Sequence, residues 1–197
     1  MGRIGAVILA AGLSSRMGAF KPLLPLGDAS LAERTAACVL AAGADPAVMV
    51  TGYRAAELET ALRNTGLIFV RNECFRDTQM LDSLRIGLAA LPPDTERALF
   101  TPVDVPLVRP ETVRLLLKTP GDFVRPVFVG RGGHPAVMDR RLFPLLRDYR
   151  GPGGLRGALA AGGIAPVNVP VTDPAVLMDC DTPEAYDRLL AYEKSMT

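Results

Sequence analysis

The stretch AVILAAGLSSRMGAFK, from Ala6 to Lys21, decides how this chain must fold. It begins as an uninterrupted apolar run and then breaks into glycines and serines that accompany two cations, Arg16 and Lys21. A short apolar run without alternation is typical of a strand that is covered on both faces, as in a parallel sheet. Ligands of such sheets collect at the carboxyl ends of the strands, so we expect a ligand beside the glycine-serine segment.

Three further apolar runs have the same character and lie at residues 47–51, 67–70 and 98–103. Helical patterns occur between and after them, at residues 30–43, 54–64 and 81–91, in a helix that Pro110 opens, and in a C-terminal helix that Pro183 opens and that ends near Lys194. This alternation predicts an α/β fold with one doubly wound, mostly parallel sheet, in a single domain over residues 1–197. The alternation of strands and helices stops after residue 118. Residues 123–138 are predicted to form a β-hairpin-like insertion before a helical stretch at 140–149.

The overall charge excludes some classes of partner. A formal net charge of +1 without a basic patch argues against nucleic acid and against an anionic membrane surface. The three cysteines, at positions 38, 74 and 180, are scattered without metal-site spacing, which favours a reducing cytoplasm over a disulfide framework. No stretch approaches transmembrane length. We therefore expect a cytoplasmic protein that meets any anionic ligand with local charges.

The glycine-serine segment has the composition of a phosphate-binding loop. Gly12 and Gly18 allow backbone N–H groups to turn toward phosphate oxygens, and Arg16 and Lys21 add positive charge. Five residues separate the two glycines where a Walker P-loop has four, and Ala19 stands where that motif has lysine. The three-glycine Rossmann motif is also missing. The alternative is an ordinary surface loop of small residues.

The segment from Leu9 to Lys21 resembles the signature of the MobA-like nucleotidyltransferases, the group that contains the molybdenum cofactor guanylyl- and cytidylyltransferases. Three later motifs resemble the same family in the same order: Asp104-Val105-Pro106, Gly133-His134-Pro135, and the residues from Asp179 to Glu184. The resemblance implies a Rossmann-like, GT-A-like fold and a loop that binds a nucleoside triphosphate. It carries nucleotide binding over to Leu9, Ala10, Ala11, Gly12, Ser14, Arg16, Gly18 and Lys21.

Three residues farther along the chain are also predicted to lie near the nucleotide, namely Thr51, Asn72 and Ser83. Thr51 ends the second apolar run, Asn72 follows the third, and Ser83 lies near the start of the next helix, in a region that the family uses around the nucleotide. For Thr51 the alternative is an ordinary turn between a strand and a helix, and for Ser83 it is a place in the first helical turn.

Two carboxylates are predicted to hold a magnesium ion (Mg²⁺). Asp104 follows an apolar run and therefore faces the same edge of the sheet as the opening loop. Asp181 is the second candidate, because the family has Asp or Asn before its Thr-Pro-Glu, and Asp179 is left as a structural candidate. Mg²⁺ is usually held by one or two carboxylates together with phosphate and water. The alternatives are that Asp104 caps the turn at Pro106 and that Asp181 caps the last helix.

The resemblance implies an enzyme that transfers a nucleotide and releases pyrophosphate. An acceptor phosphate is largely ionised at neutral pH, so the reaction needs alignment and charge neutralisation more than a general base. Arg16, Lys21 and Asp104 are the predicted catalytic residues. Ala11 stands where the family's guanylyltransferases have glycine and its cytidylyltransferases have alanine, so CTP is favoured over GTP.

The resemblance assigns acceptor binding to His134, Gly154 and Arg156, with a phosphorylated, molybdopterin-type molecule as the acceptor. The alternative for His134 is a turn histidine bonded to nearby backbone. Pro152 stands where the cytidylyltransferases tend to have an acid. A sugar phosphate or another phosphomonoester therefore stays open as the acceptor. So does a different class of protein, a non-catalytic nucleotide-binding module that serves a molybdoenzyme.

Overall fold

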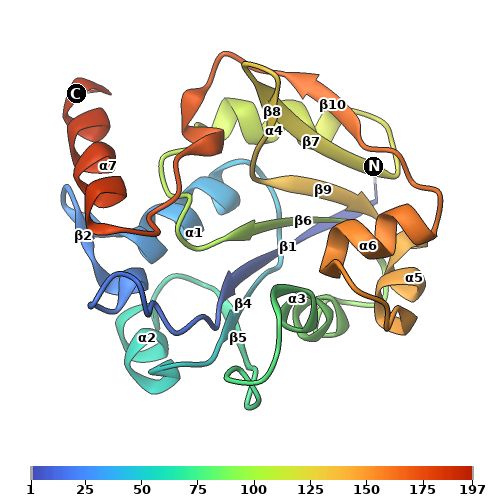
Figure 1. The fold of residues 1–197 in the computed structure, drawn as a ribbon, viewed down its shortest axis with the longest axis horizontal. Coiled ribbons are helices and arrows are strands. Elements are labelled where there is room, and N and C mark those ends of the chain that lie inside the picture. Colours follow the sequence, from blue (N-terminus) through green and yellow to red (C-terminus); the bar gives the residue numbers. More distant parts are fainter. Residues whose placement is uncertain (1, 197) are drawn as a thin grey trace.

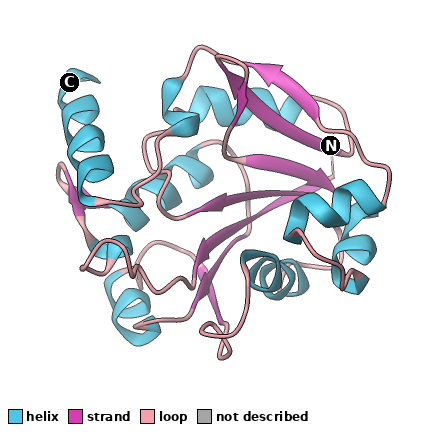
Figure 2. Ribbon diagram, in the orientation of Figure 1, coloured by secondary structure: helices cyan, strands magenta, loops and turns pink. Residues whose placement is uncertain are grey.

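The computed structural model describes residues 2–196 and shows a central sheet with helices on both faces (Figure 1, Figure 2). The strands of this sheet are β1 (Arg3–Ala10), β4 (Ala47–Thr51), β5 (Ile68–Arg71), β6 (Thr95–Pro102), β7 (Phe123–Phe128), β8 (Arg131–Gly132), β9 (Ala136–Asp139) and β10 (Val167–Pro170). Their spatial order is β10-β7-β9-β6-β1-β4-β5, with β8 paired to β7. Along this order every pair is parallel except those that β9 makes with β6 and β7. The predicted α/β fold is therefore confirmed.

The helices are α1 (Leu31–Ala41), α2 (Ala55–Ala61), α3 (Met80–Ala89), α4 (Pro110–Lys118), α5 (Phe143–Asp148), α6 (Gly154–Ala161) and α7 (Pro183–Met196). Short 3-10 turns η1 (Lys21–Leu23), η2 (Arg140–Leu142) and η3 (Pro174–Leu177) and a small ribbon of β2 (Pro25–Leu26) and β3 (Ala29–Ser30) complete the described elements. Among the described residues, no helix is both long and apolar enough to cross a membrane.

The side chains of β1 explain the two-sided core. Ala6, Ile8 and Ala10 belong to the core cluster that includes α1, α2, α4 and α7. Val7 and Leu9 alternate with them and belong to the cluster of α3, α5 and α6. Because successive side chains of a strand point to opposite faces, a strand between two helical layers must be apolar throughout. This is the pattern that the opening stretch shows.

A capping box closes the start of α1. The Ser30 hydroxyl accepts a hydrogen bond from the backbone N–H of Glu33 at 3.2 Å, and the Glu33 carboxylate accepts one from the backbone N–H of Ser30 at 2.7 Å. These reciprocal bonds satisfy donors that the first turn of a helix leaves free. The helix ends at Ala41, and Gly43 follows with a left-handed φ of 93°.

The structure differs from the sequence-based prediction in two places along the sheet. The segment after residue 118 does form a hairpin, of β7 and β8, but it is part of the main sheet rather than an insertion, because β9 returns between β6 and β7. The prediction that residues 67–70 are covered on both faces is wrong. They contribute to the edge strand β5, in which Ile68 is 44% exposed. An edge strand lacks a neighbour on one side and cannot be as buried as β1 or β4.

This topology brings several loops to one edge. β1 and β6 are adjacent and parallel, so the loops after Ala10 and Pro102 leave the sheet side by side. β9 runs the opposite way, so the residues that precede Ala136 lie at that same edge. The chain therefore brings the opening loop, Asp104 and His134 to the carboxyl ends of the parallel strands.

Candidate active site

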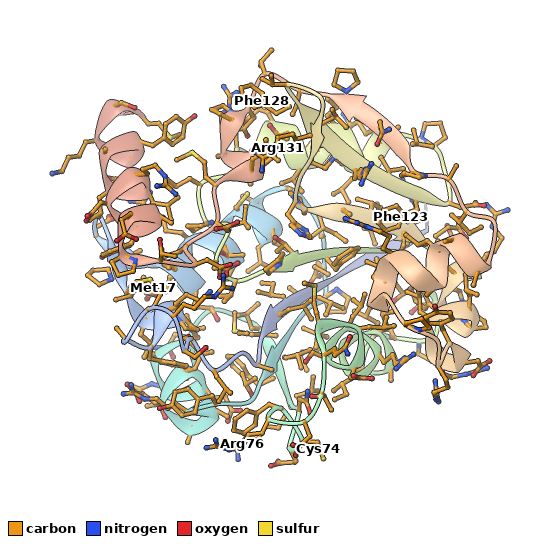
Figure 3. The ribbon with its side chains drawn as sticks, in the orientation of Figure 1. Met17, Cys74, Arg76, Phe123, Phe128 and Arg131 are labelled. Atoms are coloured by element: carbon orange, nitrogen blue, oxygen red, sulfur yellow. The ribbon has the colours of Figure 1, made fainter. Side chains whose placement is uncertain are left out.

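The opening loop leaves β1 at Ala10 and reaches η1 at Lys21. Its first turn closes when the Met17 N–H donates to the Ser14 carbonyl at 3.1 Å, and Figure 3 labels Met17 in this loop. The Ser14 hydroxyl also accepts from the Lys21 N–H at 3.3 Å, which ties the two ends of the loop together. Left-handed backbone occurs at Ser14 (φ 54°) and Gly18 (φ 65°). Gly18 relieves the strain as expected, whereas Gly12 does not have this conformation.

Not every predicted residue of this segment is accessible. Leu9, Ala10 and Ala11 are buried, and their side chains pack in the core. The Leu9 carbonyl accepts from the Val103 N–H, and the Ala11 carbonyl accepts from the Tyr53 N–H. These residues fix the start of the loop, and the exposed part of it begins at Gly12.

Four charged side chains from three parts of the chain meet at this edge. Lys21 Nζ donates to Asp104 Oδ2 at 2.7 Å and to Asp181 Oδ1 at 2.8 Å. Arg16 Nη2 donates to the other Asp181 oxygen at 2.7 Å. The side chains of Lys21 and Asp104 are each only 14% exposed, so this pair is largely shielded from water. The structure thus brings together all four charged residues that the sequence assigned to the triphosphate and the metal.

The charge states of this cluster follow from its contacts. Burial alone would lower the pKa of Lys21, but the Asp104 carboxylate, and then Asp181, outweigh it and raise that pKa above its usual value. The hydrogen bond from Lys21 lowers the pKa of Asp181, which burial opposes and Arg16 reinforces. Burial, with Asp181 and Asp104 nearby, raises the pKa of Asp179. The cluster therefore has a firmly charged ammonium between two carboxylates.

Segment 176–181 joins this cluster to a neighbouring pocket. The Cys180 N–H donates to the Asp104 carbonyl at 3.0 Å, which places the segment against the end of β6. The His134 N–H donates to the Val176 carbonyl at 2.9 Å, at the other end of the same segment. The charged cluster and the residues around His134 therefore share one wall.

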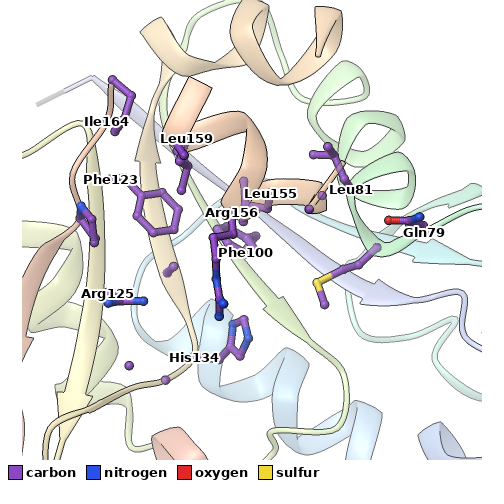
Figure 4. Close-up of a pocket in the computed structure, with 18 residues that line it drawn as sticks. Gln79, Leu81, Phe100, Phe123, Arg125, His134, Leu155, Arg156, Leu159 and Ile164 are labelled. Atoms are coloured by element: carbon purple, nitrogen blue, oxygen red, sulfur yellow. The ribbon is translucent and has the colours of Figure 1, made fainter. Parts of the chain in front are cut away.

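The pocket has a volume of about 790 Å³ and lies among β7, β9, α3 and α6 (Figure 4). Its apolar wall includes Phe100, Phe123, Leu81, Leu159 and Ile164. His134, Gly154 and Arg156, the three predicted acceptor residues, all line it. Gly154 and Arg156 lie in the first turn of α6, where free backbone N–H groups and the helix dipole favour an anion.

His134 has an unusual environment within the pocket. Its ring meets the edge of Phe100, with centroids 6.0 Å apart and planes at 75°. Nδ1 is buried without a hydrogen-bond partner among the described residues. Burial lowers the pKa of His134, although Asp104 opposes this. The ring is therefore neutral at pH 7 and can serve as a hydrogen-bonding group rather than as a cation.

Thr51, Asn72 and Ser83 do not present their side chains at this edge. Thr51 is fully buried, and its hydroxyl donates to Glu59 at 2.8 Å. Asn72 is 2% exposed, and its amide donates to the hydroxyl groups of Thr78 at 2.8 Å and Ser83 at 3.0 Å. These bonds tie the end of β5 to the start of α3. The side chains of Asn72 and Ser83 bond to each other and that of Thr51 bonds to Glu59, and their predicted place near the nucleotide stays a prediction.

Two polar side chains of the pocket were missing from the sequence-based prediction. Arg125 lines the pocket from β7, and Gln79 lines it from the start of α3. Arg125 could have been noticed, because it is the one charged residue in the otherwise uncharged strand FVRPVF. Nothing in the sequence alone places Gln79 opposite α6.

Comparison with known proteins agrees with this geometry. The sequence model of the MobA-like NTP transferase domain matches residues 6–167, which is most of the chain. The chain belongs to the MobA-like NTP transferase family. It is a nucleotidyltransferase, and the matched range includes the opening loop, Asp104 and His134.

Three relatives match this MobA-like transferase over nearly its whole length, and for two of them a solved structure has the same fold. The molybdenum cofactor cytidylyltransferase of Escherichia coli K12 is 27% identical over 189 residues, which cover 94% of this chain and 95% of that protein. A nucleotidyl transferase from Methanothermobacter (Mth528) is 28% identical with a TM-score of 0.86 and covers 99% of both chains. Rv0371c of Mycobacterium tuberculosis H37Rv is 29% identical with a TM-score of 0.85, over 96% of this chain and 98% of that one. A second structure of Rv0371c, at a TM-score of 0.81, is a complex with manganese.

The donor set of this MobA-like transferase fits a hard divalent cation. Asp104 and Asp181 each place one oxygen within 2.8 Å of the same ammonium nitrogen, so the two carboxylates converge on one point that already accommodates a cation. The described residues contain no group of three or more His, Cys, Asp or Glu side chains that could hold a metal. Two carboxylates are the number that Mg²⁺ commonly uses beside substrate phosphates.

The buried His134 predicts a pH-dependent stability. Unfolded His134 takes up a proton near its usual pKa, whereas the folded protein resists protonation, so acid favours the unfolded state. We expect the free energy of unfolding to fall between pH 7.5 and 5.5 by about 1 kcal/mol more in the wild type than in His134→Gln. Denaturant titrations at both pH values measure this difference. Because the sequence has 1 histidine, the difference between the two proteins reports on His134 alone. An equal fall in the free energy of unfolding of both proteins would contradict the inference.

Proposed function

We propose that this protein transfers CMP from CTP to a phosphorylated, molybdopterin-type acceptor and releases pyrophosphate in an Mg²⁺-dependent reaction. The observation that carries the proposal is the common wall of two sites. The cations of the opening loop meet Asp104 and Asp181 at one end of segment 176–181, and His134, which lines the pocket with Arg156, donates its N–H to Val176 at the other end. A nucleotide and an acceptor bound in these sites would have their phosphates adjacent.

The chain's own residues would act mainly by alignment. The N–H groups of the opening loop and the cations Arg16 and Lys21 would bind the triphosphate. An acceptor phosphate oxygen would then attack the α-phosphorus of CTP, and the bond from that phosphorus to the bridging oxygen would break as pyrophosphate leaves. The nucleophile is already ionised, so no side chain needs to remove a proton.

Asp104 and Asp181 would hold Mg²⁺, which supplies charge neutralisation for the triphosphate when it is bound. For Mg²⁺ to reach the two carboxylates, Lys21 would move its ammonium group from them to the phosphates. Its raised pKa keeps it charged throughout, which suits both positions. The manganese complex of the related Rv0371c is consistent with a divalent ion in this family.

Two observations support CTP as the donor. Ala11 matches the alanine that the resembling cytidylyltransferases have at this place, and it lies at the buried start of the loop, with its carbonyl bonded to Tyr53. The Escherichia coli relative that covers 94% of this chain is named as a cytidylyltransferase. For the acceptor, the wall of Phe100 and Phe123 offers a surface on which a flat ring could pack.

A pyrophosphate-release screen tests the proposal. CTP, GTP, ATP and UTP are each combined with molybdopterin, a sugar phosphate and a simple phosphomonoester, with Mg²⁺ present. We expect release with CTP and molybdopterin, and none when Mg²⁺ is removed by a chelator. Pyrophosphate release with a sugar phosphate but never with the pterin would overturn the proposed acceptor. Release with GTP alone would overturn the proposed donor. Nucleotide binding without release in any combination would overturn the transfer itself.

A further inference from the structure

Arg125 has a place in the acceptor pocket that the transfer reaction above does not explain. It is half-buried on β7 and lines the pocket together with His134 and Arg156. Figure 4 shows Arg125 and Arg156 entering the pocket from different elements. A guanidinium group is costly to bury unless something anionic or polar meets it.

The orientation of Arg125 is fixed by two neighbours. Its Nε donates to Asn168 Oδ1 at 2.8 Å, from β10, the strand on the far side of β7 from β9. Gly132 on β8 makes room for the group, because a Cβ there would lie 2.8 Å from Arg125 Cζ. The Arg125 side chain is therefore held between β10 and β8. Asn168 is its neutral hydrogen-bond partner, and the absence of a side chain at Gly132 permits this position.

Within the described part of the chain, no carboxylate neutralises the charge of Arg125. Other arginines, such as Arg16, Arg85 and Arg141, donate to aspartates at 2.6–2.7 Å. For Arg125 no ion pair with a carboxylate occurs among residues 2–196. A fixed arginine with an available fork of N–H donors is the usual means of binding a carboxylate or another oxyanion.

Arg125 stands on a strand that is set apart from the one that leads to the reaction centre. β7 is two strands away from β6, which ends before Asp104, and two strand spacings are about 10 Å. Its Nε is bonded to Asn168 of β10, the neighbour of β7 on the side away from β6. The group that Arg125 would bind must therefore be a second one, on the far side of the acceptor.

We propose that Arg125 is a specificity-determining residue that binds a second anionic group of the acceptor, so that the preferred acceptors are ring-bearing phosphomonoesters with an additional carboxylate or oxyanion. This inference rests on the proposed function, because it takes the pocket to be the acceptor site. The ring would pack against Phe123, and the phosphate would face the wall shared with Asp104.

A binding experiment tests this inference without turnover. Phenyl phosphate, 3-carboxyphenyl phosphate and 4-carboxyphenyl phosphate are titrated by NMR into the wild type, Arg125→Met and Arg131→Met. Methionine keeps the apolar stem and removes the charge. Arg131 is the matched control, since it is exposed on the same hairpin and does not line the pocket (Figure 3). Unchanged CTP binding verifies that each variant is folded.

We expect at least one carboxylated probe to bind roughly tenfold more tightly than phenyl phosphate to the wild type and to Arg131→Met. This preference should disappear in Arg125→Met. No preference in the wild type, or an equal loss for all three probes in Arg125→Met, would overturn the inference. A pyrophosphate screen that fails while the preference holds would instead count against the proposed transfer, so the two failures are distinguishable.

Discussion

Asp104→Asn is expected to reduce pyrophosphate release roughly 100-fold or more, because the substitution removes a charge at the point where the triphosphate and Mg²⁺ would meet. The asparagine has nearly the same size, and the backbone carbonyl at this position still accepts from the Cys180 N–H. The wall between the two sites should therefore persist. Steady-state pyrophosphate release measures the loss, and Mn²⁺ binding followed by electron paramagnetic resonance measures the weakened metal site.

Asp122→Asn is the matched control for that experiment. Asp122 forms an ion pair with Arg141 in which both side chains are well exposed, and such pairs contribute little. Its loss should leave release within about twofold of the wild type. If Asp104→Asn kept both its Mn²⁺ binding and at least a tenth of the wild-type rate, Asp104 would be reduced to a capping residue of the turn at Pro106.

The elements that could be predicted well from the sequence are the strands whose side chains are buried on both faces and are therefore apolar. β1, β4 and β6 lie between two helical layers, so the buried part of each must be apolar, and this pattern is visible without any knowledge of neighbours. Their parallel order then brings the loops after them to one edge. The convergence of Lys21 and Asp104 follows from that rule alone.

The parts that the sequence did not reveal depend on distant neighbours. β10 is mostly exposed, so its four residues have no apolar run to mark them. Helix α6 begins at Gly154 after Gly153, and glycines normally indicate a loop. Asn72 donates to Thr78 and Ser83, and these hydrogen bonds form only because the start of α3 lies close to the end of β5.

Lys21→Met is expected to have two effects of opposite sign. Triphosphate binding should weaken roughly tenfold or more, because a charge-assisted contact from the loop is lost. Mn²⁺ binding in the absence of nucleotide should become tighter, because the ammonium that now bonds to both Asp104 and Asp181 no longer competes for their oxygens. Calorimetric titration of CTP and of Mn²⁺ measures the two affinities separately.

Lys118→Met provides the comparison, since Lys118 is exposed at the end of α4 and is not one of the four residues of the charged cluster. It should change neither affinity. A merely structural role for Lys21 would weaken CTP and Mn²⁺ together, because the two carboxylates would then repel each other and the loop would lose its attachment. Only the exchange of one cation for another between the same two carboxylates predicts that one affinity falls while the other rises.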